Sequence, residues 1–254
     1  MRNFLQSLGY VHREAWLFIL ACPLLAAIPI MVEFAQHIVE LRTGMYVDEA
    51  GAKAAEAHPL RMAFGFAKVI SLLLPMYWMT RFLHGGRDAD AARLFDRRAV
   101  WLYSGVLLFG MSHSALSMFV LPQTTAWLAS SMLGGFVIAA LLARWQAAAP
   151  LGVFVSPWQS ACQMGRHLPW GLAFPIVAML PVMVLHYALA IIAVIVAPTW
   201  LDWVLMAFDS LVVGWLAGIL VAANYVVAIR AGPIQAEPIQ SPRVDLSKVG
   251  LPLG

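Results

Sequence analysis

The sequence predicts an all-α, polytopic membrane protein: a bundle of six transmembrane helices arranged as three hairpins, with an interfacial amphipathic helix before each odd-numbered span. Of its 254 residues, 62% are hydrophobic and only 11% are charged, whereas an ordinary soluble domain has about 25% charged residues. Six apolar runs approach or exceed the roughly 20 residues that a helix needs to cross the hydrocarbon layer. Basic residues gather in alternate connections between these runs, as expected for a multi-pass chain.

The apolar runs divide the chain into a six-span transmembrane domain over 1–230 and a short tail. They lie near 16–36, 62–80, 100–120, 125–142, 170–196 and 203–229. Pairing neighbouring runs gives hairpins over about 1–81, 82–144 and 145–230. The segment 231–254 contains four prolines and little apolar content, which predicts a disordered cytoplasmic tail.

The basic residues predict the orientation, since Lys and Arg in short loops stay on the cytoplasmic side. With the N-terminus inside, 12 of the 16 Lys and Arg fall in the inner segments. We therefore expect a multi-pass protein of the cell inner (plasma) membrane with both termini cytoplasmic. The net charge of +3 follows from this topology, so no nucleic-acid partner is expected. Two isolated cysteines argue against a disulfide framework.

The three odd-numbered spans begin with similar pentapeptides: HREAW, RRAVW and RHLPW. Each has two cations or a cation and a histidine, two spacers and a tryptophan, which suits phosphate contact and an indole at headgroup level. Duplication of a hairpin and convergence on anchoring chemistry both explain the match. The pattern predicts membrane lipids as partners and these interface anchors: Arg13, Trp16, Arg97, Arg98, Trp101, Arg166, His167 and Trp170.

Short segments before the odd spans mix aromatic or aliphatic residues with polar ones, which favours helices lying on the inner leaflet. These segments are Asn3–Tyr10, Ala91–Arg98 and Pro157–Met164. Within the even spans, small residues recur four apart, a spacing that lets helix backbones approach closely. It predicts helix packing, within the chain or between subunits, at Ser210, Gly214, Gly218, Ser131 and Gly135.

Ionisable residues inside the predicted spans are the main candidates for function, because a charge in hydrocarbon costs several kcal/mol unless it is paired or hydrated. Lys68 and Asp209 each lie seven positions from the outer edge, so they are expected at similar depth, about 10 Å in at 1.5 Å per residue. With His113 and His186 they form a candidate intramembrane polar site. One interpretation is a structural ion pair; the other is a hydrated cavity in which Lys68 and Asp209 switch.

Glu33, His37 and Glu40 share one face where the first span is expected to leave the membrane. Carboxylate and imidazole ligands can bind zinc or another divalent ion, which makes Glu33 and His37 weak metal candidates beside the simpler interpretation of a solvated helix face. A haem held by His113 and His186 is a further option. Neither idea has a supporting motif, so the sequence by itself predicts no metal and no cofactor.

Signatures of soluble enzymes are missing from the sequence: it has no Walker-type phosphate loop, GxGxxG, HExxH or GxSxG. The six spans, the interfacial helices and the HREAW entry resemble poorly characterised bacterial six-span inner-membrane proteins, the glycerophosphodiesterase membrane-domain-like group. That resemblance implies an accessory or structural role in the membrane and carries over no functional residue. The layout is also similar to permease subunits of type-2 ABC exporters, with 81–98 as the coupling segment, although the short turn at 198–202 departs from them.

These observations favour a non-enzymatic membrane scaffold, assembly factor or accessory subunit of a membrane complex. The alternative is a transporter or permease component that moves a lipid, an ion or a small solute. No catalytic residue is nominated, and an enzyme is the less favoured class. Protein partners are expected to be other subunits of a membrane complex.

Overall fold

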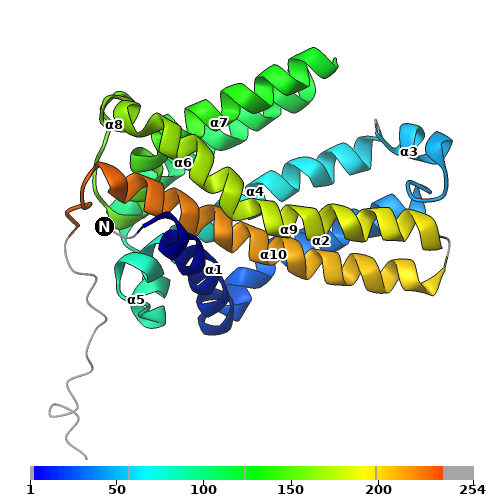
Figure 1. Ribbon diagram of the computed structural model, residues 1–254, viewed down its shortest axis with the longest axis horizontal. Helices are drawn as coiled ribbons and strands as arrows, with labels where there is room; N and C mark the ends of the chain where they lie inside the picture. The colour runs from blue at the N-terminus through cyan, green and yellow to red at the C-terminus, as the bar shows by residue number, and fades with distance from the viewer. Residues whose placement is uncertain (1–2, 57, 123, 198, 237–254) are drawn as a thin grey trace, which may run out of the picture.

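The computed structural model describes residues 3–56, 58–122, 124–197 and 199–236. Within these residues the regular structure is helical throughout, without a strand (Figure 1). The α-helices are α1 (Phe4–Ala21), α2 (Pro23–Arg42), α3 (Glu49–Glu56), α4 (Pro59–His84), α5 (Ala89–Arg93), α6 (Arg97–Ala115), α7 (Thr125–Ala148), α8 (Pro157–Met164), α9 (Leu168–Val196) and α10 (Trp200–Ala228).

Six of these helices, some extended by short 3-10 or π segments, are long and apolar enough to cross a membrane: α2, α4, α6, α7, α9 and α10. They form the hairpins α2–α4, α6–α7 and α9–α10, and the predicted fold class is confirmed. The short helices α5 and α8 lie at one end of the bundle, whereas α3 lies at the other (Figure 1). We refer to these as the α8 end and the α3 end.

The first span begins seven residues later than the sequence predicted. The expected span was 16–36, but α1 ends at Ala21 and α2 runs over Pro23–Arg42. Cys22 has φ −132° and ψ 57°, outside the helical region, because a residue before proline is disfavoured there. The shift assigns Trp16 to the helix before the span and brings His37 and Glu40, with Glu33, inside the span.

The other expected short segments differ in how closely they match. Pro157–Met164 is α8 as predicted, while Asn3–Tyr10 is only the first part of α1. Ala91–Arg98 is not one helix, because α5 ends at Arg93 and α6 begins at Arg97. The Asp96 side chain caps α6 by accepting hydrogen bonds from the backbone amides of Arg98 and Ala99.

The predicted tail begins as ordered chain. Arg144 on α7 donates hydrogen bonds to the carbonyls of Gly232 (2.7 Å) and Pro233 (3.1 Å), and Ile234 is buried. Gly232, Pro233 and Ile234 thus contact the bundle, while the disorder of the tail stays a prediction. Positions 237–254 lie outside the described residues.

A buried ion pair ties α1 to the turn after α4. The Glu14 carboxylate is 1% exposed and accepts two hydrogen bonds from Arg87, at 2.8 and 2.7 Å, and two from Arg13, at 3.3 and 3.0 Å. Burial raises the pKa of Glu14, but the two guanidinium groups outweigh burial and hold it below its usual value. Arg87 has φ +74°, which a non-glycine residue rarely adopts, so this contact helps to hold a strained turn.

Helix α10 is the most buried span and packs against α9, α2 and α1. Its glycines permit the close approach. A Cβ at Gly214 would lie 2.4 Å from Cγ1 of Ile30 on α2, and one at Gly218 would lie 2.9 Å from Cβ of Ala15 on α1. The small residues of α10 thus lie at contacts within the chain, and a Cβ at either glycine would overlap the neighbouring helix.

We expect Gly218→Ala to lower the midpoint temperature of unfolding in detergent by several degrees, because α1 must move away from α10 at a cost of about 2 kcal/mol. Gly134→Ala is the matched control, since nothing lies within 4 Å of a Cβ at that position. Helix propensity alone should leave the control as stable as the parent or up to about 1 kcal/mol more stable. Equal midpoints for the two variants would contradict this packing.

Candidate functional site

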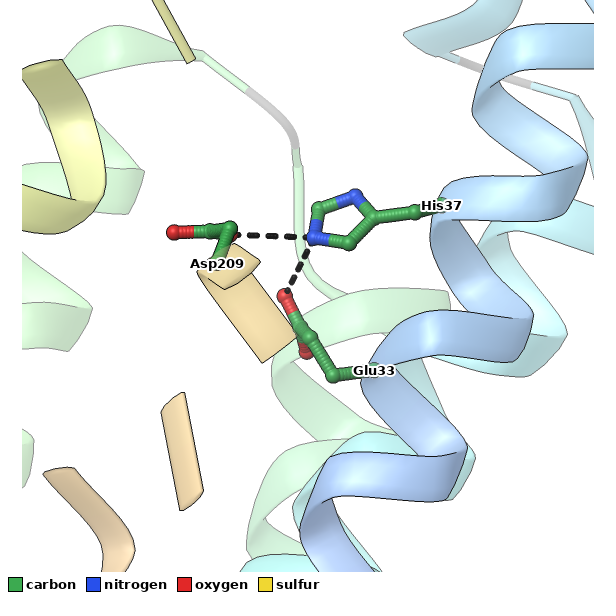
Figure 2. Close-up of side chains that lie close together, drawn as sticks. All are labelled: Glu33, His37 and Asp209. Carbon is green, nitrogen blue, oxygen red and sulfur yellow. Dashed lines mark hydrogen bonds and ion pairs between the residues drawn. The ribbon is translucent and has the colours of Figure 1, made fainter. Parts of the chain in front are cut away.

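Polar side chains from α2, α4, α9 and α10 meet inside the half of the bundle nearest α3. At their centre are Glu33 and His37 from α2 and Asp209 from α10, which are 1%, 4% and 0% exposed. Figure 2 shows the imidazole lying between the two carboxylates, with one ring nitrogen directed at both. We call these three residues the central triad.

The distances within the central triad are those of direct contact. Nε2 of His37 lies 3.0 Å from Oδ2 of Asp209 and 3.5 Å from Oε1 of Glu33. One atom from each residue lies within 4.8 Å of the others. Asp209 and His37 are 172 positions apart, so only the packing of α10 on α2 assembles the group.

Glu40 orients His37 from the other side of the ring. Its Oε2 lies 2.9 Å from Nδ1 of His37 and accepts from the Tyr46 hydroxyl at 2.8 Å, while Oε1 accepts from Gln36 (2.8 Å) and Arg61 (3.3 Å). Burial and the neighbouring Glu40 carboxylate raise the pKa of Tyr46, so its hydroxyl remains a donor. Because a carboxylate can only accept, the Nδ1 atom of His37 donates its hydrogen to Glu40. The other ring nitrogen, Nε2, then faces the central triad.

The two other triad members each have a partner on a further helix. Nζ of Lys68 on α4 lies 2.7 Å from both carboxylate oxygens of Glu33. Nδ1 of His186 on α9 lies 2.7 Å from Oδ1 of Asp209. Lys68 and Asp209 were expected to contact each other. They belong to the same cluster, but Lys68 contacts Glu33 and Asp209 contacts His37.

This arrangement needs a positive charge at its centre. With neutral histidines, the carboxylates of Glu33, Glu40 and Asp209 exceed the cations Lys68 and Arg61 by one negative charge. Nε2 would then present a lone pair to two carboxylates, and a buried charge without compensation is costly. A proton on Nε2, or a metal ion between the three residues, removes both problems. The geometry therefore suits a cation held between these residues, either a proton on His37 or a metal ion.

The sequence identified most of these residues but treated them as two groups. Glu33, His37 and Glu40 were placed where the first span leaves the membrane, because that span was expected to end at 36. Tyr46 and Gln36 were missed altogether. A polar residue four positions before Glu40 in an apolar helix was the available signal for Gln36, whereas Tyr46 follows α2 and carries no periodic signal.

His113 does not join the cluster. Its ring stacks on Phe109 of the same helix, with centroids 6.4 Å apart. Nearby, Oγ of Ser117 lies 3.1 Å from Oγ of Ser131, linking α6 to α7. Of the four residues expected to form one polar layer, Lys68, Asp209 and His186 lie in the cluster, together with Glu33, His37 and Glu40. His113 and His186 have separate partners and do not face each other as a pair of haem ligands would.

The remaining packing candidates contact elements of the same chain. Ser210 donates to the carbonyl of Met206 in its own helix at 2.8 Å. A Cβ at Gly135 would lie 3.6 Å from Nε2 of His113, so this stripe lies at the α6–α7 contact.

The predicted anchors share one sequence pattern but have different surroundings. Trp101 is 78% exposed, and Trp16 is half exposed with its ring 5.3 Å from that of Trp215. Trp170 instead stacks on Phe174, with the Arg230 guanidinium 4.2 Å from its ring centroid. The cations also differ: Arg13 contacts Glu14 and Arg166 contacts His167, while Arg97 and Arg98 are exposed.

An apolar cavity of about 340 Å³ lies between α4, α7, α9 and α10, nearer the α8 end than the cluster. Its lining begins at Val69, the residue after Lys68 on α4, and at Met179, two turns from His186 along α9. Asn224 and Gln146 are its polar lining residues. Nδ2 of Asn224 is buried and unpaired among the described residues. Cluster and cavity thus follow one another along the same helices.

No family model, no curated protein and no solved structure matches this chain. The fold and the site define it as an integral, multi-pass α-helical membrane protein with a buried cluster of ionisable side chains.

Proposed function

We propose that this protein is a membrane transporter component that binds a cation, a proton or a metal ion, at the central triad and passes it across the membrane. The supporting observation is that His37 Nε2 faces the carboxylates of Glu33 and Asp209 inside a membrane-spanning bundle. Intramembrane ionisable groups of this kind mark ion pathways and proton relays. A purely structural ion pair needs only two opposite charges, whereas here one imidazole nitrogen faces two carboxylates.

The cavity supports a route from the cluster toward the α8 end. Its lining residues share the helix faces of Lys68, His186 and Asp209, and polar groups recur at its far end with Asn224 and Gln146. The distribution of Lys and Arg supports an orientation with the α8 end and both termini on the cytoplasmic side of the inner membrane. The cluster then lies toward the external face.

The test is cation flux in proteoliposomes with trapped pH-sensitive and metal-sensitive dyes, under an imposed potassium diffusion potential. We expect the parent protein to carry one or both cations faster than empty liposomes. Asp209→Asn should reduce that flux at least about 10-fold, because it removes one triad charge while keeping the side chain's shape. Asp90→Asn is the matched control, since the Asp90 side chain is 84% exposed, and it should retain full flux.

Flux that is equal in the parent and in Asp209→Asn would contradict the proposal.

The second candidate is the non-enzymatic scaffold, assembly factor or accessory subunit. It is favoured by the α6–α7 hairpin, which leans away from α9 and α10 (Figure 1) and exposes large apolar residues on α7. Absence of flux together with a stable stoichiometric protein companion in mild detergent would favour that candidate.

A further inference from the structure

The ligand class of the central triad follows from its geometry and rests on the proposed function. We infer that Glu33, His37 and Asp209 form a binding site for a divalent transition-metal ion of the zinc class. The three residues offer one imidazole nitrogen and two carboxylate oxygens, all buried and all within 4.8 Å of one another. Imidazole with carboxylate is a ligand set that suits zinc and its neighbours.

The spacing of the ligand atoms fits a tetrahedral ion. Metal–ligand bonds of about 2.1 Å at tetrahedral angles place ligand atoms roughly 3.4 Å apart. Nε2 of His37 lies 3.5 Å from the Glu33 oxygen and 3.0 Å from the Asp209 oxygen. The third spacing, between the Glu33 and Asp209 oxygens, is within 4.8 Å, so side-chain movement is needed to bring all three ligand atoms onto one ion.

Two of the three ligands, His37 and Asp209, are already held by a second residue, as metal ligands usually are. Glu40 accepts from Nδ1 of His37 and so leaves Nε2 available. His186 contacts the other oxygen of Asp209. These supports come from α2 and α9, so the site is positioned by the bundle and not by a loop.

The coordination number points to an exchangeable ion. Three protein ligands leave one position of a tetrahedral ion open, whereas structural zinc sites are closed by four. Lys68 lies against Glu33 and its side chain is 24% exposed, so the ammonium has room to turn away when a cation enters. A metal site with one open coordination position and a displaceable lysine suits an ion that is transported better than an ion that is bound permanently.

The test is metal binding to the detergent-solubilised, chelator-treated full chain, measured by titration with Zn²⁺ and by absorption with Co²⁺ as the spectroscopic probe. We expect one ion per chain and the intense visible absorption of tetrahedral Co²⁺. His37→Ala and Asp209→Asn should each weaken Zn²⁺ binding at least about 100-fold, because each removes a ligand. His113→Ala is the control and should bind as the parent does.

The absorption of the parent protein keeps the test decisive if a variant fails to fold. Absence of one-to-one binding to the folded parent, or binding that Asp209→Asn leaves unchanged, would overturn the site. Proton flux that depends on Asp209 without metal binding would overturn the metal site and leave the transport proposal standing. One-to-one metal binding without any cation flux would support the site and contradict transport.

Discussion

Replacing Lys68 with methionine should destabilise the protein by about 3 kcal/mol, since it leaves the Glu33 carboxylate buried without its ammonium partner. Glu33 is 1% exposed, and both of its oxygens lie 2.7 Å from Nζ of Lys68. The double variant Glu33→Leu with Lys68→Met removes both charges. It should recover much of the lost stability, because a buried pair replaced by apolar side chains is often neutral.

The measurement is the midpoint temperature of unfolding in detergent for the parent, the two single variants and the double variant. Lys53→Met is the matched control, because Lys53 pairs with Glu49 on the surface and both side chains are largely exposed. A surface pair contributes little, about 1 kcal/mol at most. If the single and double losses were additive, the pair would not be coupled and the contact would be wrong.

Replacing Glu40 with leucine should have a larger effect than replacing Lys68, because it leaves several donors without an acceptor. Gln36, His37, Tyr46 and Arg61 all direct a polar atom at this carboxylate. Each buried unsatisfied donor costs about 1–3 kcal/mol. We expect Glu40→Leu to prevent recovery of folded protein.

Glu40→Gln is the informative partner variant because it keeps an acceptor oxygen and the side-chain volume. It should fold with a lower midpoint temperature, because the amide is a weaker acceptor than the carboxylate for the donors around it. Thermal unfolding measures this loss of stability, and recovery from size-exclusion chromatography measures whether each variant folds. Recovery of Glu40→Leu at the level of the parent would show that Glu40 does not hold this network together.

The sequence pointed to most residues of the cluster, but it did not predict that they form a single group. Lys68, His186 and Asp209 stood out because charged or titratable residues interrupt apolar runs. Glu33, His37 and Glu40 stood out by their spacing on one helix face. What the sequence missed was the break at Cys22 and Pro23, which moves the first span and brings those three residues to the depth of Asp209. His113 was included on depth alone, and depth does not specify which way a helix faces.

The sequence by itself determined the class of protein, the six spans and their pairing into hairpins, because bilayer thickness and the cost of burying charge act on each segment separately. Only the tertiary structure decided that Glu33, His37 and Asp209 form one group. Residues 172 positions apart meet through the rotation and close approach of α10 on α2, set by contacts such as Gly214 with Ile30. Such contacts depend on the shapes of two helices together, and neither segment encodes them alone.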